Sequence, residues 1–205
     1  PLVTGGSGAA MGLPENFRRA GLLPPRQAVP KLAPAGGHAA VLSGSCSRAT
    51  LAQVAAMAAM HPARALDPLE LARDGAGTVH GLVTWAKPLL AAGPVLIHAS
   101  APPETVAAAQ EKIGRDRASV LVEQAMAALA RALVGAGVRR LVVAGGETSG
   151  AVVSALGIEA LEIGPQIAPG VPATLTYGSP RIALVLKSGN FGGSDFFLTA
   201  LDQLA

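Results

Sequence analysis

Several residue classes are scarce in this 205-residue chain, and each scarcity excludes something. The single cysteine, Cys46, cannot close an internal disulfide, so we expect a reducing, cytoplasmic setting. Charged residues make up only 14% of the chain and hydrophobic residues 50%, which excludes a disordered protein because enough apolar area is available to offset the ordering entropy. Apolar stretches end at glycine, proline or charge before the roughly 18 residues that a spanning helix needs, so no membrane segment is expected.

Aromatic residues and basic clusters are also rare. Aromatics account for 3% of the chain, and the net charge of +3 comes from 16 basic and 13 acidic residues. The densest basic spots are only the pairs Arg18-Arg19 and Arg139-Arg140. Nucleic-acid binding is therefore disfavoured, because neither a basic patch nor aromatics for base stacking are available.

The chain has two regions that differ in how often glycine and proline occur. Residues 1–34 are dense in both and predict a glycine loop, a short helix over Glu15–Ala20 and a linker. Because this region begins at Pro1 inside a glycine-rich motif, without Met, we interpret it as the end of a preceding domain in a longer polypeptide. Residues 35–205 are expected to form one domain, as their length allows.

Apolar runs alternate with helical patterns through residues 35–205. The strand candidates are short runs bounded by Gly, Pro or Ser, namely His38–Leu42, Pro94–Ala99, Arg139–Ala144, Leu161–Gly164, Ala173–Tyr177 and Ile182–Leu186. The helix candidates have apolar residues at three- and four-residue spacing, namely Ala49–Met60, Pro103–Ile113, Ala118–Ala136, Ser149–Leu156 and Asp195–Leu204. This alternation predicts an α/β fold with a mainly parallel sheet flanked by helices.

Three strand candidates end in turns that are rich in glycine and small polar residues. The turns are 43–47, 145–150 and 187–193. Strand-to-helix turns of a parallel sheet share its carboxyl edge, and glycine together with helix N-termini suits an anion there. The turns therefore predict an anion-binding cleft, although each turn alone is also common without a ligand. They do not distinguish ATP from a dinucleotide or a sugar phosphate.

Standard nucleotide fingerprints are absent. The chain contains neither the P-loop pattern nor a Rossmann fingerprint with the usual spacing, although Gly145-Gly146 with Gly150 approaches some dehydrogenase turns. No His or Cys cluster has metal-ligand spacing. An NAD(P)-dependent oxidoreductase domain and a non-catalytic interaction module with purely structural turns therefore stay open as alternatives.

At these turns the sequence resembles the four-carbon acid sugar kinase family, in particular the C-terminal nucleotide-binding domain of 3-oxo-tetronate kinases. The matching segments follow in the expected order over nearly the whole chain: Val41–Ser47 with Thr50 and Gln53, Val143–Gly150, Ile167–Pro172, and Leu186–Gly193 with Asp195. The resemblance implies an ATP-binding domain of a sugar-acid kinase that is catalytically incomplete here. It implies ATP and Mg²⁺ as cofactors and a four-carbon acid sugar held mainly by a missing N-terminal domain. Which acid sugar, and whether the protein is a homo-oligomer, is left open.

The candidate nucleotide-binding residues come from the three turns. They are Ser43, Gly44, Ser45, Ser47, Gly145, Gly146, Glu147, Thr148, Gly189, Asn190 and Gly192. Glu147 is expected to bind a ribose hydroxyl or a Mg²⁺-bound water, or simply to favour the helix dipole. Ser47, Thr148 and Asp195 are alternatively helix caps.

Two more polar residues, Lys187 and Cys46, belong to the same turns. Lys187 is expected either to reach a phosphate oxygen or to be a solvated strand end, and Cys46 to be small and packed. No histidine, catalytic residue or metal ligand is assigned.

Overall fold

The computed structural model describes residues 4–5, 7–25, 28 and 31–204. They separate into two compact units, Pro1–Lys31 and Leu32–Ala205. Gly6 and Pro30, part of the predicted loop and linker, lie outside the described residues.

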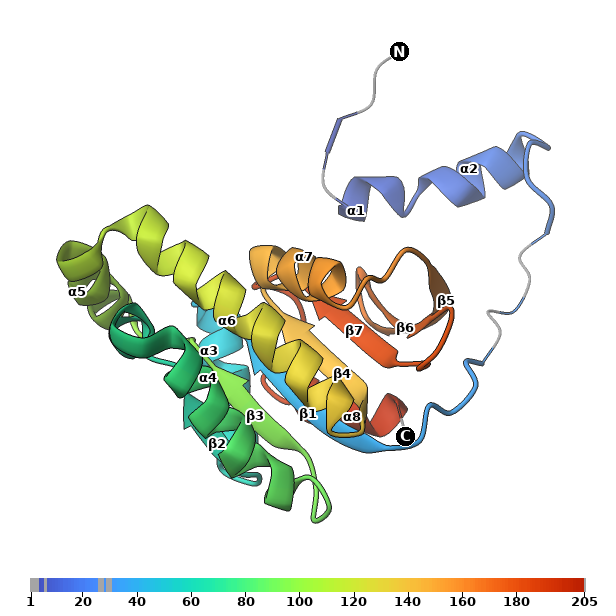
Figure 1. Cartoon of the computed structure of the whole chain (residues 1–205). Helices are drawn as coiled ribbons and strands as arrows, with labels where there is room; N and C mark the ends of the chain where they lie inside the picture. The colour runs from blue at the N-terminus through green and yellow to red at the C-terminus, as the bar shows by residue number, and fades with distance from the viewer. Residues whose placement is uncertain (1–3, 6, 26–27, 29–30, 205) are drawn as a thin grey trace. The chain divides into compact units, whose positions relative to one another are not determined.

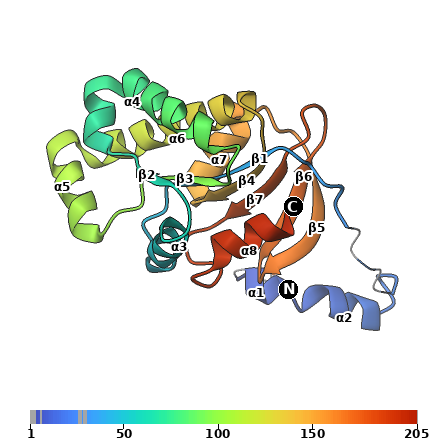
Figure 2. The same ribbon diagram turned by 90° about the horizontal axis from the view of Figure 1, so that it is seen from below.

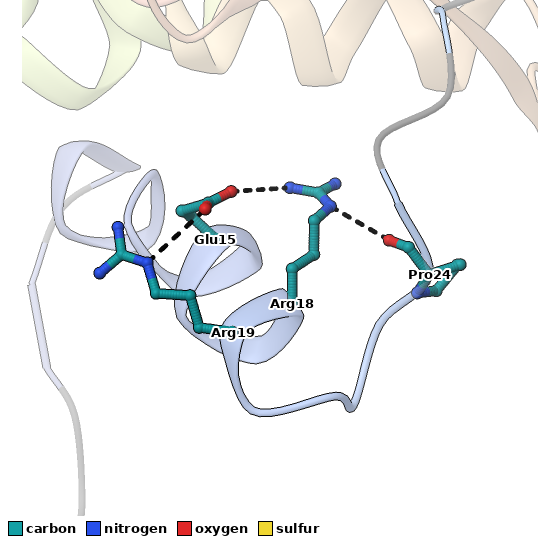
Figure 3. Close-up of polar contacts among 4 residues, drawn as sticks. All are labelled: Glu15, Arg18, Arg19 and Pro24. Atoms are coloured by element: carbon teal, nitrogen blue, oxygen red, sulfur yellow. Dashed lines mark hydrogen bonds and ion pairs between the residues drawn. The ribbon is translucent and has the colours of Figure 1, made fainter.

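The first unit contains two short helices, α1 (Ser7–Ala10) and α2 (Leu13–Arg19), which are labelled in Figure 1. Figure 3 shows the polar contacts of α2. Glu15 Oε2 lies 3.8 Å from Arg18 Nη1 and Glu15 Oε1 lies 3.6 Å from Arg19 Nε, while Arg18 Nε donates to the Pro24 carbonyl at 3.2 Å. Exposed pairs of this kind contribute about 0–1 kcal/mol. Because α2 buries no side chain, this unit shows no core of its own among the described residues.

The second unit is built on a seven-stranded sheet with the order β2-β3-β1-β4-β7-β6-β5. Its strands are β1 (His38–Ser43), β2 (Ala63–Ala65), β3 (Val95–His98), β4 (Val138–Ala144), β5 (Leu161–Ala168), β6 (Val171–Thr176) and β7 (Ala183–Lys187). The pairs from β2 through β7 are parallel, while β6 and β5 continue the sheet antiparallel. The predicted α/β fold with a mainly parallel sheet is therefore confirmed.

Six helices flank this sheet. They are α3 (Arg48–Ala58), α4 (Pro68–Leu89), α5 (Pro103–Ile113), α6 (Arg115–Gly135), α7 (Gly146–Ala155) and α8 (Phe196–Gln203). Figure 2 shows α4, α6 and α7 over one face and α3 and α8 over the other. Two buried clusters match this layering, since strand residues alternate between them: Leu141 faces α6, and its neighbour Val142 faces α3 and α8.

Helix α6 is long and apolar enough to cross a membrane by length and composition alone. Its residues Met126, Leu129 and Leu133 are fully buried in the cluster that covers the sheet. A core helix of a globular domain passes the same test of length and composition, and α6 has the position of one.

Three elements were not predicted from the sequence: α1, which lies in the expected glycine loop, and α4 and β2. Helix α4 breaks at Asp74, whose φ of −151° and ψ of 84° are not helical, and Asp74 Oδ1 then accepts from Gly77 N at 2.8 Å to start the second half. Gly75 and Pro88 also interrupt the apolar period. Strand β2 has only three residues and two of them are exposed, so it has no apolar run.

Candidate functional site

The ends of four parallel strands lie in one row across the carboxyl edge of the sheet. In the strand register His98 of β3 pairs with Ser43 of β1, Ser43 with Ala144 of β4, and Ala144 with Lys187 of β7. The three predicted glycine turns follow directly after Ser43, Ala144 and Lys187. The sheet therefore brings the three turns together at one edge.

Strand β1 lies at a topological switch point. The helix that follows β1, α3, covers one face of the sheet, whereas the helices that follow its neighbours β3 and β4 lead to the opposite face. Adjacent chains that leave a sheet on opposite faces open a crevice at the carboxyl edge, which is where α/β proteins bind ligands. The first turn, after Ser43, is at the centre of that crevice.

The first turn folds over the end of β4. Gly44 N and Ser45 N both donate to the Ala144 carbonyl, at 2.9 and 3.2 Å. Ser43 itself is fully buried, and its hydroxyl pairs with that of Ser100 at 2.8 Å. Its hydroxyl therefore joins β1 to the loop after β3, whereas Ser45 and Ser47 lie nearer the surface.

Thr148 holds the first and second turns together. Its Oγ1 would contact a β-carbon built on Gly44, and it lies 2.9 Å from one built on Gly145. Thr148 is 4% exposed, and α7 is capped by Gly145 without a side-chain hydrogen bond. Thr148 is therefore a buried spacer between two backbones, and its predicted role as a cap is wrong.

The start of α7 leaves backbone donors open. Gly145 has a φ of +124°, a conformation that favours glycine, and its N–H donates to the Lys187 carbonyl at 2.8 Å. The first N–H groups of a helix have no acceptor within the helix, and α7 has no side-chain cap. Gly146 and Glu147 are exposed, and nothing lies within 4 Å of a β-carbon built on Gly146. This helix start can accept an anion.

The third turn is tied to the first through one carbonyl. The Gly189 carbonyl accepts from Ser47 Oγ at 2.6 Å, from Thr50 Oγ1 at 2.9 Å and from Lys187 Nζ at 2.9 Å. Ser47 Oγ also accepts from Thr50 N at 3.2 Å, so Ser47 does cap α3 while it contacts the third turn. The cap and the turn contact are compatible.

Lys187 is 1% exposed, so neither the solvated strand end nor a free phosphate-binding ammonium describes it. Burial lowers the pKa of its ammonium from 10.5 to about 8. Its Nζ also lies 5.9 Å from the centre of the Phe196 ring.

Gln53 of α3 holds the rest of the third turn. It is fully buried, and its Nε2 lies 3.0, 3.2 and 2.9 Å from the carbonyls of Phe191, Gly192 and Gly193. One amide thus fixes three consecutive peptides. Gln53 and Thr50 are polar residues on the buried face of α3. Both belong to the segments that resemble the kinase family, but neither was among the candidate site residues, because those were taken from the turns alone.

A cavity adjoins the turns on the face covered by α4, α6 and α7. Its volume is about 450 Å³. It shares Gly44, Cys46, Glu147 and Thr148 with the turns. Small apolar residues of α5 and α6 line one side of it, namely Val106, Ala108, Ala109, Ala118 and Val122. The other side includes Leu66 and Leu69, and the polar groups come from Asp67, His98, Ser100, Thr105, Gln110, Ser119 and Glu123.

The remaining predictions differ in outcome. Cys46 is exposed, so the expectation that it is packed is wrong; its position in a turn, outside any strand or helix, explains this. Asp195 precedes α8 but makes no capping hydrogen bond from its side chain. Asn190 is exposed in the third turn. Within the described residues no three His, Cys, Asp or Glu side chains group as a metal site.

The switch-point crevice, the open helix start and the adjoining cavity have the features of a nucleotide-binding α/β domain. The chain belongs to the family described as the nucleotide-binding C-terminal domain, whose model matches residues 40–197.

Curated relatives agree with this family. The chain is 56% identical over 208 residues to a 3-oxo-tetronate kinase of Cupriavidus necator and 55% identical over 206 residues to one of Pseudomonas fluorescens. Each match covers 100% of this chain and 47% of the relative. The chain therefore spans about half the length of the curated relatives it matches.

Solved structures share the fold. A Haemophilus influenzae protein matches with a TM-score of 0.83 and 35% identity, over 96% of this chain and 47% of that protein. A Bordetella bronchiseptica protein, described as a domain-swapped dimer with bound citrate, matches with a TM-score of 0.66 and 20% identity, over 82% of this chain and 41% of that protein. At that identity the second likeness supports the fold alone.

Proposed function

We propose that this domain binds ATP and supplies the nucleotide-binding half of a kinase that phosphorylates a four-carbon acid sugar. The observation that carries the proposal is the uncapped start of α7, which opens between two other turns at the switch point of the sheet. The proposal also draws on the 56% identity to a 3-oxo-tetronate kinase.

The phosphates would lie on the three turns. Phosphoryl transfer requires mainly positioning and charge stabilisation, and no protein nucleophile. The N–H groups of Gly146, Glu147 and Thr148 point along the positive end of the α7 dipole, which favours a polyanion. Backbone donors at fixed positions suit that task.

The adenosine would lie in the cavity beside the turns. At about 450 Å³ the cavity falls within the range of small-molecule sites, about 300–1,000 Å³. Its small apolar walls suit a flat aromatic ring, and its few polar groups suit the ring nitrogens and the ribose. Because Gly44 and Glu147 border both regions, one ligand can occupy the turns and the cavity together.

Glu147 is the residue that fits Mg²⁺. It is exposed at the open start of α7 and lines the cavity. A nucleotide-bound Mg²⁺ typically takes most of its ligands from phosphates and water and only one or two from protein carboxylates. Bound there, the ion would neutralise charge on the phosphates; Glu147 would hold it directly or through a water.

The acid sugar would be bound by the part of the relatives that this chain does not match. The proposal places the protein in the cytoplasm, which agrees with its single unpaired cysteine. The alternatives of an NAD(P) domain and a non-catalytic module make different predictions about ligands.

Calorimetry and thermal melting with ADP, ATP and NAD(P) test the proposal. We expect Mg-ATP and ADP to bind and to raise the melting temperature, as a ligand specific for the folded state must. We expect no turnover of a 3-oxo-tetronate by the 205-residue chain alone. Stabilisation by NAD(P) only would overturn the proposal in favour of the oxidoreductase, and no response to any nucleotide would favour the interaction module.

A further inference from the structure

Lys187 joins the third turn to the start of α3, the helix that follows the first turn. Its Nζ donates to Gly189 O at 2.9 Å and to Ser188 O at 3.2 Å in the third turn, and to Thr50 Oγ1 at 3.1 Å at the start of α3. An ammonium group has three protons. Since all three have protein acceptors, Lys187 has no proton left to donate to a ligand.

The acceptors of Lys187 are uncharged. Among the described residues no carboxylate lies within ion-pair distance of Nζ, and the aromatic ring of Phe196 is its other close neighbour. A buried cation without a counter-ion is unfavourable, and the lowered pKa of Lys187 is the expression of that cost. The fold alone would be served as well by an apolar side chain of similar volume.

A polyanion bound on the turns would supply the missing negative charge. The ammonium lies directly below Gly189, whose carbonyl also accepts from Ser47 and Thr50. Because the Gly189 carbonyl accepts from Ser47, Thr50 and Lys187 together, these hydrogen bonds fix the orientation of the Gly189 peptide. A charge buried close to a ligand also acts through a low effective dielectric and is poorly screened by salt.

We propose that Lys187 is a positioning residue for the nucleotide: its buried charge fixes the third turn against the first and attracts the phosphates without touching them. This inference rests on the proposed function. Under this inference the Lys187 charge lowers the stability of the fold and raises the affinity for the nucleotide. A lysine with a purely structural role would not have both effects.

Lys187→Met and Lys187→Gln test the role of the charge. We expect both variants to bind ADP at least tenfold more weakly than the parent, while their melting temperatures are equal to or higher than the parent's. Lys187→Arg, which keeps the charge and the donors, should recover part of the affinity if it folds. Arg181→Gln is a control that removes an exposed cation; its binding should be unchanged.

Titration of the parent protein gives a second, independent readout. We expect ADP affinity to fall by about tenfold as the pH rises from about 7 to about 9, across the Lys187 pKa of about 8, while the melting temperature rises. The second ionisation of a phosphate, about pH 6, is complete across this window. The other titratable or charged groups on the adjoining turns, strands and helices are Cys46, Arg48, Arg139, Arg140, Glu147, Asp195 and Asp202. The arginines stay charged and the carboxylates are already ionised in this range, and Cys46→Ala and Asp195→Asn are titrated as controls that should keep the profile. Both trends should disappear in Lys187→Met.

The outcomes separate the two proposals. If the parent binds no nucleotide at any pH, the proposed function fails. If the parent binds ADP and Lys187→Met and Lys187→Gln bind it equally well, or if both lose stability and affinity together with no pH trend in the parent, the role of Lys187 is only structural and this inference is overturned.

Discussion

The Oγ1 atom of Thr148 occupies the space that a β-carbon on Gly44 would need. The two residues belong to different turns, after β1 and β4. The two turns can lie this close together only because residue 44 has no β-carbon. Gly44→Ala should therefore destabilise the domain by about 1–3 kcal/mol through overpacking. Thr148→Ala in the same chain should relieve part of this, giving a coupling energy of about 1 kcal/mol in urea denaturation. Strictly additive effects would contradict the contact.

Gly146→Val should separate binding from folding. A β-carbon at Gly146 meets nothing within 4 Å, so the side chain would extend into the space in front of α7 where we place the phosphates. We expect a loss of more than about 1.4 kcal/mol in ADP binding, which is tenfold, with a melting temperature within a few degrees of the parent's. Gly81→Val, also in open space but on α4, is the matched control and should bind normally. Normal ADP binding by a folded Gly146→Val would remove α7 from the site.

Gly189→Ala should lower stability and binding together, in contrast to Gly146→Val. A β-carbon there would lie 2.5 Å from Ser45 Oγ and 3.1 Å from Ser47 Cβ and Oγ, so the Ser45 side chain must turn away and the third turn must shift relative to Ser47. Melting and ADP titration of the variant measure both effects. A Gly189 variant that keeps full stability while losing ADP binding would show that the two turns yield without strain.

Gln53→Leu should loosen the third turn. The substitution leaves the carbonyls of residues 191–193 without their buried donor, which costs about 1–3 kcal/mol. We expect faster amide hydrogen exchange in residues 188–195 and weaker ADP binding. Gln124→Leu, on the exposed face of α6, controls for the change of residue type. Unchanged exchange in the third turn would show that α8 and Lys187 suffice to hold it.

The free energy of unfolding should rise with pH above 8. Because the pKa of Lys187 is about 8 when folded and 10.5 when unfolded, the unfolded chain binds more protons between these values, and stability increases with pH there. At about 1.4 kcal/mol per pKa unit the gain is about 2–3 kcal/mol. Urea denaturation at pH 7.5 and pH 10 measures it, and Lys187→Met should show no such rise.

The sheet and the turns were predictable because their signals are local. Strand β4 ends in the apolar run Leu141–Ala144, directly before Gly145-Gly146, and the register of a parallel sheet then places this turn beside the other two. Helix α4 was missed because Gly75, Gly77 and Pro88 obscure its period, and the cap that Asp74 provides inside the helix restarts it in a way that only the folded backbone shows.

The partners of the buried polar residues were not predictable. Nothing local indicates that the hydroxyl of Ser43 meets Ser100 or that Lys187 is buried, since these pairs join residues far apart in sequence. Their environment is set by strand order and by which helix covers which face. Thr50 and Gln53 are likewise polar residues whose role depends on the third turn, 137 or more positions away.

The layering of the domain divides the site between two surfaces. The buttressed network of Lys187, Thr50 and Gln53 belongs to the α3 and α8 face, whereas the cavity belongs to the face of α5 and α6. Under our assignment, the residues that determine base specificity and the residues that position the phosphates lie mostly in different parts of the chain. Substitutions at Ala109 or Ala118 can then change which nucleotide base the domain prefers. The turns that bind the phosphates, and the buried residues that hold those turns, would stay unchanged.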